Sequence, residues 1–274
     1  INAESINSGN AIVKRNSTPM VRLDYTAWSS PVDNQQLKAF SPNTLDNRFY
    51  QYLYTGTTTS TAYESVNPYT NFIPGKGYLI RAANNWPTSG TIFNGSFNGN
   101  LNNGNFNQNI GAGYNLIGNP YPSPIQSSLF FNLNSNVSTL YFWNHNSAAV
   151  GGVYPINNYA SRTRLGGVAA ASGGEIPNDY IQTGQGFYVL SSASNDVLFT
   201  NSIRSNAISS TQFYRNANED LNGSHLFRLN LNNTSNSFNQ ILIGYSDIAT
   251  NGFDNQVDGI ILNQDINTIY TKIE

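Results

Sequence analysis

The sequence of 274 residues contains no cysteine and little charge. Without thiols it can form no disulfide and has no cysteine nucleophile, which argues against a small extracellular eukaryotic domain but not against bacterial secretion. Only 10% of its residues are charged and the formal net charge is −2, whereas about a quarter of residues is usual. No basic stripe is available to neutralise phosphates, so we expect no nucleic-acid partner.

Long apolar runs are also missing. No segment has 18 apolar residues in succession, so we expect no membrane-spanning helix. The sequence opens without methionine at Ile1 and stops within a strand-like pattern at residues 269–274. We therefore expect it to be a piece of a longer protein.

Residues that commonly perform catalysis are scarce. The two histidines, His145 and His225, are far apart and both lie at the ends of predicted strands. No Gly-x-Ser-x-Gly nucleophile motif is present. The sequence therefore predicts a protein that is not an enzyme and that needs no cofactor, with calcium as the single candidate ligand of this kind.

Aromatic residues and asparagine take the place of the missing charge. Aromatics make up 13% of the chain, and about one residue in six is asparagine. The aromatics alternate with Val, Ile and Thr, which is typical of strands. Helical turns are expected only at residues 34–39 and 124–133. The predicted fold class is all-β, with tandem β-sandwich-like modules.

The most informative pattern is an internal duplication. Residues 72–80 and 180–189 both read as a Gly-x-Gly-aromatic strand entry, and each follows an aromatic run and a proline-marked turn. A strand rather than a helix follows each glycine pair, so neither resembles a dinucleotide-binding loop. The glycines are expected to let the chain enter a sheet through a tight turn. Two copies of one module indicate an architectural protein.

The duplication sets the predicted domain boundaries. They are an N-terminal strand segment 1–19, a first module 20–97, an Asn/Gly-rich connection 98–112, a second module 113–211 and the first strands of a further, incomplete β-sandwich 212–274. Residues 160–174 look like an insertion rich in Gly, Ala and Ser, which is typical of an exposed loop. Residues 226–231 and 239–245 predict a β-hairpin.

Two aromatic residues are candidates for ligand binding. Tyr121 lies in a proline-rich corner, residues 118–125, where it would either present an aromatic ring on a stiff backbone or pack beneath the corner. The second interpretation is favoured because the first module has a Ser-Pro corner at the same place. Trp86 lies in a loop-like segment, so its ring is expected to be accessible to a sugar.

A set of acidic residues suggests a metal. Asp247, Asp254 and Asp258 recur after the last predicted strand with asparagines between them. Carboxylate and carbonyl oxygens are the ligands that calcium prefers. The spacing matches no EF-hand, and Asp and Asn are also common turn residues. Calcium at these positions is therefore a candidate, with turn formation as the alternative.

The paired modules, residues 25–32 and the Gly-Asn-Pro-Tyr-Pro-Ser element at residues 118–123 resemble large surface and secreted proteins of Bacteroidota, especially flavobacteria. Residues 227–258 resemble the region that such proteins carry before a carboxyl-terminal sorting domain. The resemblance covers nearly the whole chain. It implies export by the type IX secretion machinery and display outside a Gram-negative cell. It supplies no catalytic residues.

These observations lead to one functional hypothesis and two alternatives. The hypothesis is a non-enzymatic, extracellular cell-surface β-repeat protein that acts as a stalk, adhesin or surface-layer component. One alternative is a glycan-binding module. The other is a subunit of a self-assembling surface filament, in which neighbouring copies of the chain are the partners.

Overall fold

We describe the protein from a computed structural model. The structure describes residues 7–52, 62–147, 149, 154, 156–206, 225–232, 238–262 and 268–272. The strands of its first half are β1 (Ala11–Asn16), β2 (Tyr25–Trp28), β3 (Phe49–Tyr52), β4 (Tyr63–Ser65), β5 (Tyr78–Arg81) and β6 (Asn94–Gly99). The next are β7 (Phe106–Ile110), β8 (Gly113–Gly118), β9 (Ile125–Gln126), β10 (Val137–Trp143), β11 (Tyr159–Arg162), β12 (Gly167–Val168), β13 (Tyr180–Ile181), β14 (Gly186–Ser191) and β15 (Asn195–Phe199). Strands β16 (His225–Asn232) and β17 (Phe238–Tyr245) follow.

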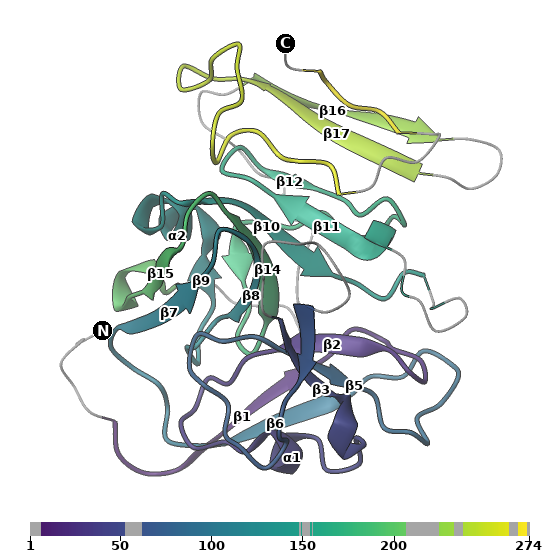
Figure 1. Cartoon of the computed structure of the whole chain (residues 1–274), viewed down its shortest axis with the longest axis vertical. Helices are drawn as coiled ribbons and strands as arrows, with labels where there is room; N and C mark the ends of the chain where they lie inside the picture. Colours follow the sequence, from purple (N-terminus) through teal and green to yellow (C-terminus); the bar gives the residue numbers. More distant parts are fainter. Residues whose placement is uncertain are drawn as a thin grey trace.

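Helices are short. In the segments that the structure describes they include α1 (Leu37–Phe40), α2 (Ser127–Leu133) and the 3₁₀ turns η1 (Asp46–Arg48), η3 (Ile156–Asn158) and η4 (Asn201–Ile203). Helix α2 lies within the predicted segment 124–133, and α1 overlaps the predicted segment 34–39 and ends one residue beyond it. The all-β fold class is confirmed, with antiparallel sheets in a sandwich-like arrangement (Figure 1). No helix in the described segments has the length and apolar character needed to cross a bilayer.

Two sheets have the same strand order. In the first half the order is β2-β5-β3-β4, and in the second it is β8-β14-β10-β11, extended by β12. The registers agree as well, because Ala27 pairs with Leu79 in the first sheet and Leu116 pairs with Tyr188 in the second. The duplication seen in the sequence is therefore present in the strand topology.

A second strand pair completes each copy. Strand β1 pairs with β6 in the first half, and β7 pairs with β15 in the second. We call β1–β6 module one and β7–β15 module two. Each module begins earlier in the chain than predicted, because segment 1–19 contains β1 and connection 98–112 contains β7.

The two modules hold each other by reciprocal contacts. Trp28 of module one forms a β-bridge with Gln185, and Ile117 of module two forms one with Lys76. The backbone repeats this symmetry: Ser29 N donates to the carbonyl oxygen of Gly184, and Gly118 N donates to that of Gly75, both at 3.0 Å. The carboxyl end of β2 in module one therefore packs against the glycine turn of module two. The carboxyl end of β8 in module two packs against the glycine turn of module one in the same way.

The glycines are required at this contact. Gly75 and Gly184 have φ angles of +81° and +76°, which side chains with a Cβ rarely adopt. A Cβ at either position would also lie 3.2 Å from a phenylalanine ring of the opposite module, Phe199 for Gly75 and Phe97 for Gly184.

One hydrophobic core extends through both modules. Trp28, Phe40 and Phe97 of module one belong to the same buried cluster as Phe130 and Phe187 of module two. The two modules therefore share one hydrophobic core and are not independent domains joined in series. In Figure 1 module one lies at the bottom, module two above it and the β16–β17 hairpin at the top.

The predicted exposed insertion at 160–174 is wrong. It supplies β11 and β12, and Ala160 and Ala170 are fully buried. Its small residues serve close packing, because a Cβ at Gly167 would lie 2.1 Å from the carbonyl oxygen of Pro177. The Gly, Ala and Ser residues of this segment, which are typical of loops, here allow close packing at the edge of a sheet.

Candidate functional site

Tyr121 is not available to a ligand, so its candidacy as an exposed aromatic is corrected. The residue is 0% exposed, and its hydroxyl donates to the carbonyl oxygen of Gly104 at 2.7 Å. The Arg204 guanidinium lies 5.0 Å from its ring centre. Desolvation by burial raises the pKa of the Tyr121 phenol. The proline-rich corner therefore packs its tyrosine inward, as the alternative interpretation required.

Trp86 is half-buried on the loop between β5 and β6. Its indole Nε1 donates to the carbonyl oxygen of Met20 at 3.1 Å, and its ring centre lies 6.1 Å from that of Phe93. The ring closes the loop over module one and offers at most part of one face to a ligand.

The three aspartates do not form a ligand set. Asp254 accepts a hydrogen bond from Thr250 Oγ1 at 2.9 Å, and Asp258 accepts one from the Asp254 backbone N–H at 2.7 Å. Asp247 is exposed. Among the described residues no three acidic or histidine side chains are grouped as metal ligands. The turn-forming alternative accounts for the two aspartates whose contacts are seen.

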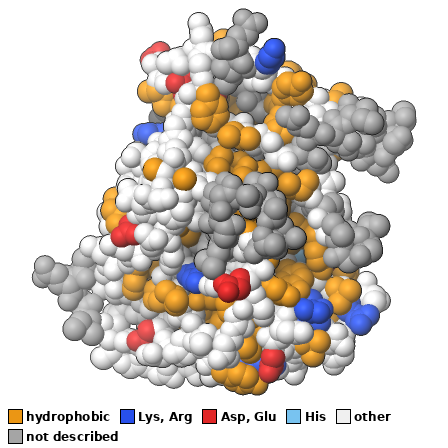
Figure 2. All heavy atoms as spheres, viewed as in Figure 1, with side chains coloured by type: hydrophobic (Ala, Val, Ile, Leu, Met, Phe, Trp, Pro, Cys, Tyr) orange, Lys and Arg blue, Asp and Glu red, His pale blue; other side chains and the backbone are white. Residues whose placement is uncertain are grey.

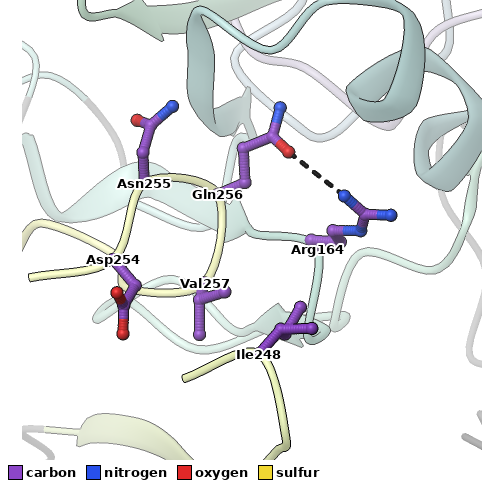
Figure 3. A pocket seen from close by; sticks show the side chains of 6 residues that line it. All are labelled: Arg164, Ile248, Asp254, Asn255, Gln256 and Val257. Carbon is purple, nitrogen blue, oxygen red and sulfur yellow. Dashed lines mark hydrogen bonds between the residues drawn. The ribbon is translucent and has the colours of Figure 1, made fainter. Parts of the chain in front are cut away.

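A shallow hollow of about 270 Å³ lies where the turn after β11 meets the loop after β17 (Figure 3). Arg164 and Gln256 point toward one another across it, with Arg164 Nη1 donating to Gln256 Oε1 at 3.4 Å. Gln256 also donates through Nε2 to the carbonyl oxygens of Phe131 and Asn134. These contacts attach the loop to module two, so Arg164 and Gln256 serve packing.

A half-buried histidine lies where the modules meet, two residues after β10 ends. His145 Nε2 lies 2.9 Å from the carbonyl oxygen of Tyr25 and therefore donates to it, while Nδ1 accepts from Thr18 Oγ1 at 2.7 Å. Burial lowers the pKa of His145, and burial raises the pKa of nearby Asp24. The imidazole is held neutral as a cross-module hydrogen-bonding group. The sequence indicated only an ordinary strand-end residue, because its partners are more than 100 positions away.

Tyrosines fill a second layer between the two main sheets. The buried cluster there comprises Ala27, Leu79, Leu116, Tyr141 and Tyr188, with further tyrosines packed against it. Tyr188 and Tyr63 hydroxyls lie 3.2 Å apart, and burial raises the pKa of Tyr25 to about 12. The Tyr25 phenol therefore remains protonated at neutral pH, and the tyrosines of this layer act as large packing groups with polar ends.

The outward side of the β16–β17 hairpin is apolar. Phe227, Leu229 and Leu231 alternate along β16 and are 43%, 40% and 37% exposed. On the opposite side of the strand, Arg228 Nη2 donates to the carbonyl oxygen of Gly167 at 3.2 Å, which holds the hairpin against β12. We call the Phe227, Leu229 and Leu231 side the outer face. The sequence predicted the hairpin but not which side would be covered.

The face of the molecule in Figure 2 carries few charged side chains. Fold and surface together define a duplicated, interlocked all-β protein with an apolar outer face on its last hairpin. The chain belongs to the family described as "Domain of unknown function (DUF8693)", whose model matches residues 1–274. No curated protein and no solved structure matches the chain.

Proposed function

We propose that the chain is a non-enzymatic structural segment of an extracellular cell-surface protein of a Gram-negative bacterium. The observation that carries this proposal is the reciprocal contact between the two glycine turns and the opposite modules. It joins two β modules in one core without disulfides, so local opening of one module disrupts the other. A segment of this kind suits a stalk, adhesin or surface layer that must resist proteases.

The export route follows from the sequence resemblance to type IX secretion substrates of Bacteroidota. The low surface charge and the asparagine-rich composition support a role outside the cell. We expect the type IX machinery to be the partner during export.

Antibody labelling of cells tests this proposal. Intact and permeabilised cells of the bacterium that carries the gene are labelled with an antibody against the chain. Intact cells should be labelled, and inactivating type IX secretion should restrict the labelling to permeabilised cells. An internal location in cells with active secretion contradicts the proposal.

The outer face favours self-association as a second candidate. Three alternating apolar side chains on one side of a two-stranded sheet form a surface that another copy could cover. Leu229→Lys should reduce self-association in concentration-dependent light scattering. The matched control is Ile12→Lys, because Ile12 is 63% exposed on β1, away from the hairpin. Equal scattering by both variants and the parent chain contradicts this role for the outer face.

A further inference from the structure

Three polar side chains of module one form a connected chain across β3, β4 and the glycine turn. Lys76 Nζ donates to Gln51 Oε1, and Gln51 Nε2 donates to Glu64 Oε2 at 2.6 Å. Gln51 and Glu64 are cross-strand partners, and Lys76 lies between the two glycines before β5. An amine, a carboxamide and a carboxylate are thus held together from three separate segments.

Module two shows that the fold does not need these residues. Tyr50 pairs with Leu79 as Tyr141 pairs with Tyr188, so the next residue of β3, Gln51, corresponds to Phe142.

The remaining two positions follow from the same registers. Glu64 is the partner of Gln51 as Ala160 is the partner of Phe142, and Lys76 corresponds to Gln185 in the second glycine turn. The same framework therefore accepts Phe, Ala and Gln where module one has Gln, Glu and Lys.

The surroundings favour reaction between the amine and the carboxamide. Lys76 and Gln51 are half-buried, and the Lys76 amine lies 5.6 Å from the centre of the Tyr78 ring. Desolvation by burial lowers the pKa of Lys76, while nearby Glu64 raises it. The bridge between Lys76 and Ile117 anchors the lysine backbone. Groups fixed in this way react as if at very high local concentration.

We propose that Lys76 and Gln51 form an intramolecular isopeptide bond, with Glu64 as the proton carrier. Glu64 takes a proton from the Lys76 ammonium. The free Nζ then attacks Gln51 Cδ, which is bonded to the oxygen that Nζ already contacts. The Cδ–Nζ bond forms and the Cδ–Nε2 bond breaks.

The step balances without an oxidant or a co-reactant. Nζ loses a further proton as the amide forms, and protons pass through Glu64 to the departing Gln51 nitrogen. Ammonium is the sole product released, and the Glu64 carboxylate is regenerated. The bond would close a covalent loop around residues 51–76 of module one. This inference concerns a modification and does not depend on where the protein is located.

Mass spectrometry of the purified full chain tests the proposal. The intact mass, followed until it stops changing, should be lower than the sequence mass by one ammonia. Trypsin should cleave after Arg48 and Arg81 but not after the modified Lys76, because the amide removes its charge. The expected product is a single peptide 49–81 that lacks one ammonia. Separate, unmodified peptides 49–76 and 77–81 overturn the proposal.

Variants identify which residues are responsible for any loss of ammonia. Lys76→Arg keeps the cation but has no comparable nucleophile, and Gln51→Glu has no ammonia to lose, so both should give a loss-free 49–81 region. Glu64→Gln should slow the loss by at least tenfold. Asn-Gly pairs such as Asn94-Gly95 can also lose ammonia, but none lies within residues 49–81. A loss in this region that persists in Lys76→Arg overturns the proposal. Circular dichroism confirms that each variant is folded.

Discussion

Gly77→Ala tests whether the reciprocal contact joins the two modules. The added methyl group would lie 2.5 Å from the carbonyl oxygen of Ile117 and 2.7 Å from Cγ of Leu116. The backbone oxygen can move only if β8 shifts away from module one, so the clash acts on the whole contact. Overpacking of this kind costs typically about 1–3 kcal/mol, and we expect the upper end, about 3 kcal/mol.

The structure supplies a symmetric comparison. Gly186 is the counterpart of Gly77, and a methyl group there would meet the backbone carbon of Ala27 at 2.9 Å. This clash is milder, so Gly186→Ala should cost about 1–2 kcal/mol. Gly252→Ala is the control, because the nearest atom to its added methyl group, Thr250 Oγ1, is 3.7 Å away. It should change stability by less than about 0.5 kcal/mol.

The assay is chemical denaturation followed by tryptophan fluorescence and near-ultraviolet circular dichroism. Trp28 is 2% exposed at the module contact and reports on it directly. Both probes should show one shared transition, and Gly77→Ala should lower the melting temperature by roughly 6–12 °C. If Gly77→Ala is as stable as Gly252→Ala, the contact does not hold the modules together. Two separate transitions in the parent chain would equally refute a shared core.

Four further measurements test the structure. Burial lowers the pKa of His145 below its ordinary 6.5, so the unfolded chain binds the proton first as the pH falls. The free energy of unfolding should therefore decrease below about pH 6.5, and His145→Gln should reduce this pH dependence in denaturation series. Asp179→Ala removes the carboxylate that lies 3.3 Å from the Arg162 guanidinium, a side chain that is 3% exposed, and should cost about 3 kcal/mol in urea unfolding. Tyr121→Phe leaves the Gly104 carbonyl oxygen without its donor and should lower the free energy of unfolding by about 1–2 kcal/mol. Calcium and chelator should give equal melting temperatures, and a rise with calcium would contradict the turn-forming assignment of the aspartates.

The fold class and the duplication were predictable from local patterns. Alternating aromatics indicate strands wherever they occur, and the two glycine pairs mark equivalent sheet entries. The β16–β17 hairpin was predicted for the same reason, since its two strands are separated by a short polar segment. Each of these features depends on residues close together in the sequence.

The contacts between modules were not predictable in this way. The partners of Gly75 and Gly184 lie in the other module, and nothing near either glycine indicates which strand approaches it. The insertion at 160–174 was misinterpreted because small residues are typical both of loops and of crowded packing. Only the neighbouring carbonyl of Pro177 shows that Gly167 belongs to the second class.

Covalent fusion of two equivalent halves changes how substitutions act. In a symmetric homodimer of identical subunits every substitution appears at both copies of a site, so a residue that suits one copy is imposed on the other. Here Lys76 of module one is equivalent to Gln185 of module two, and Gln51 is equivalent to Phe142. A single polypeptide can therefore carry reactive polar residues in one module and unreactive packing residues at the equivalent positions of the other.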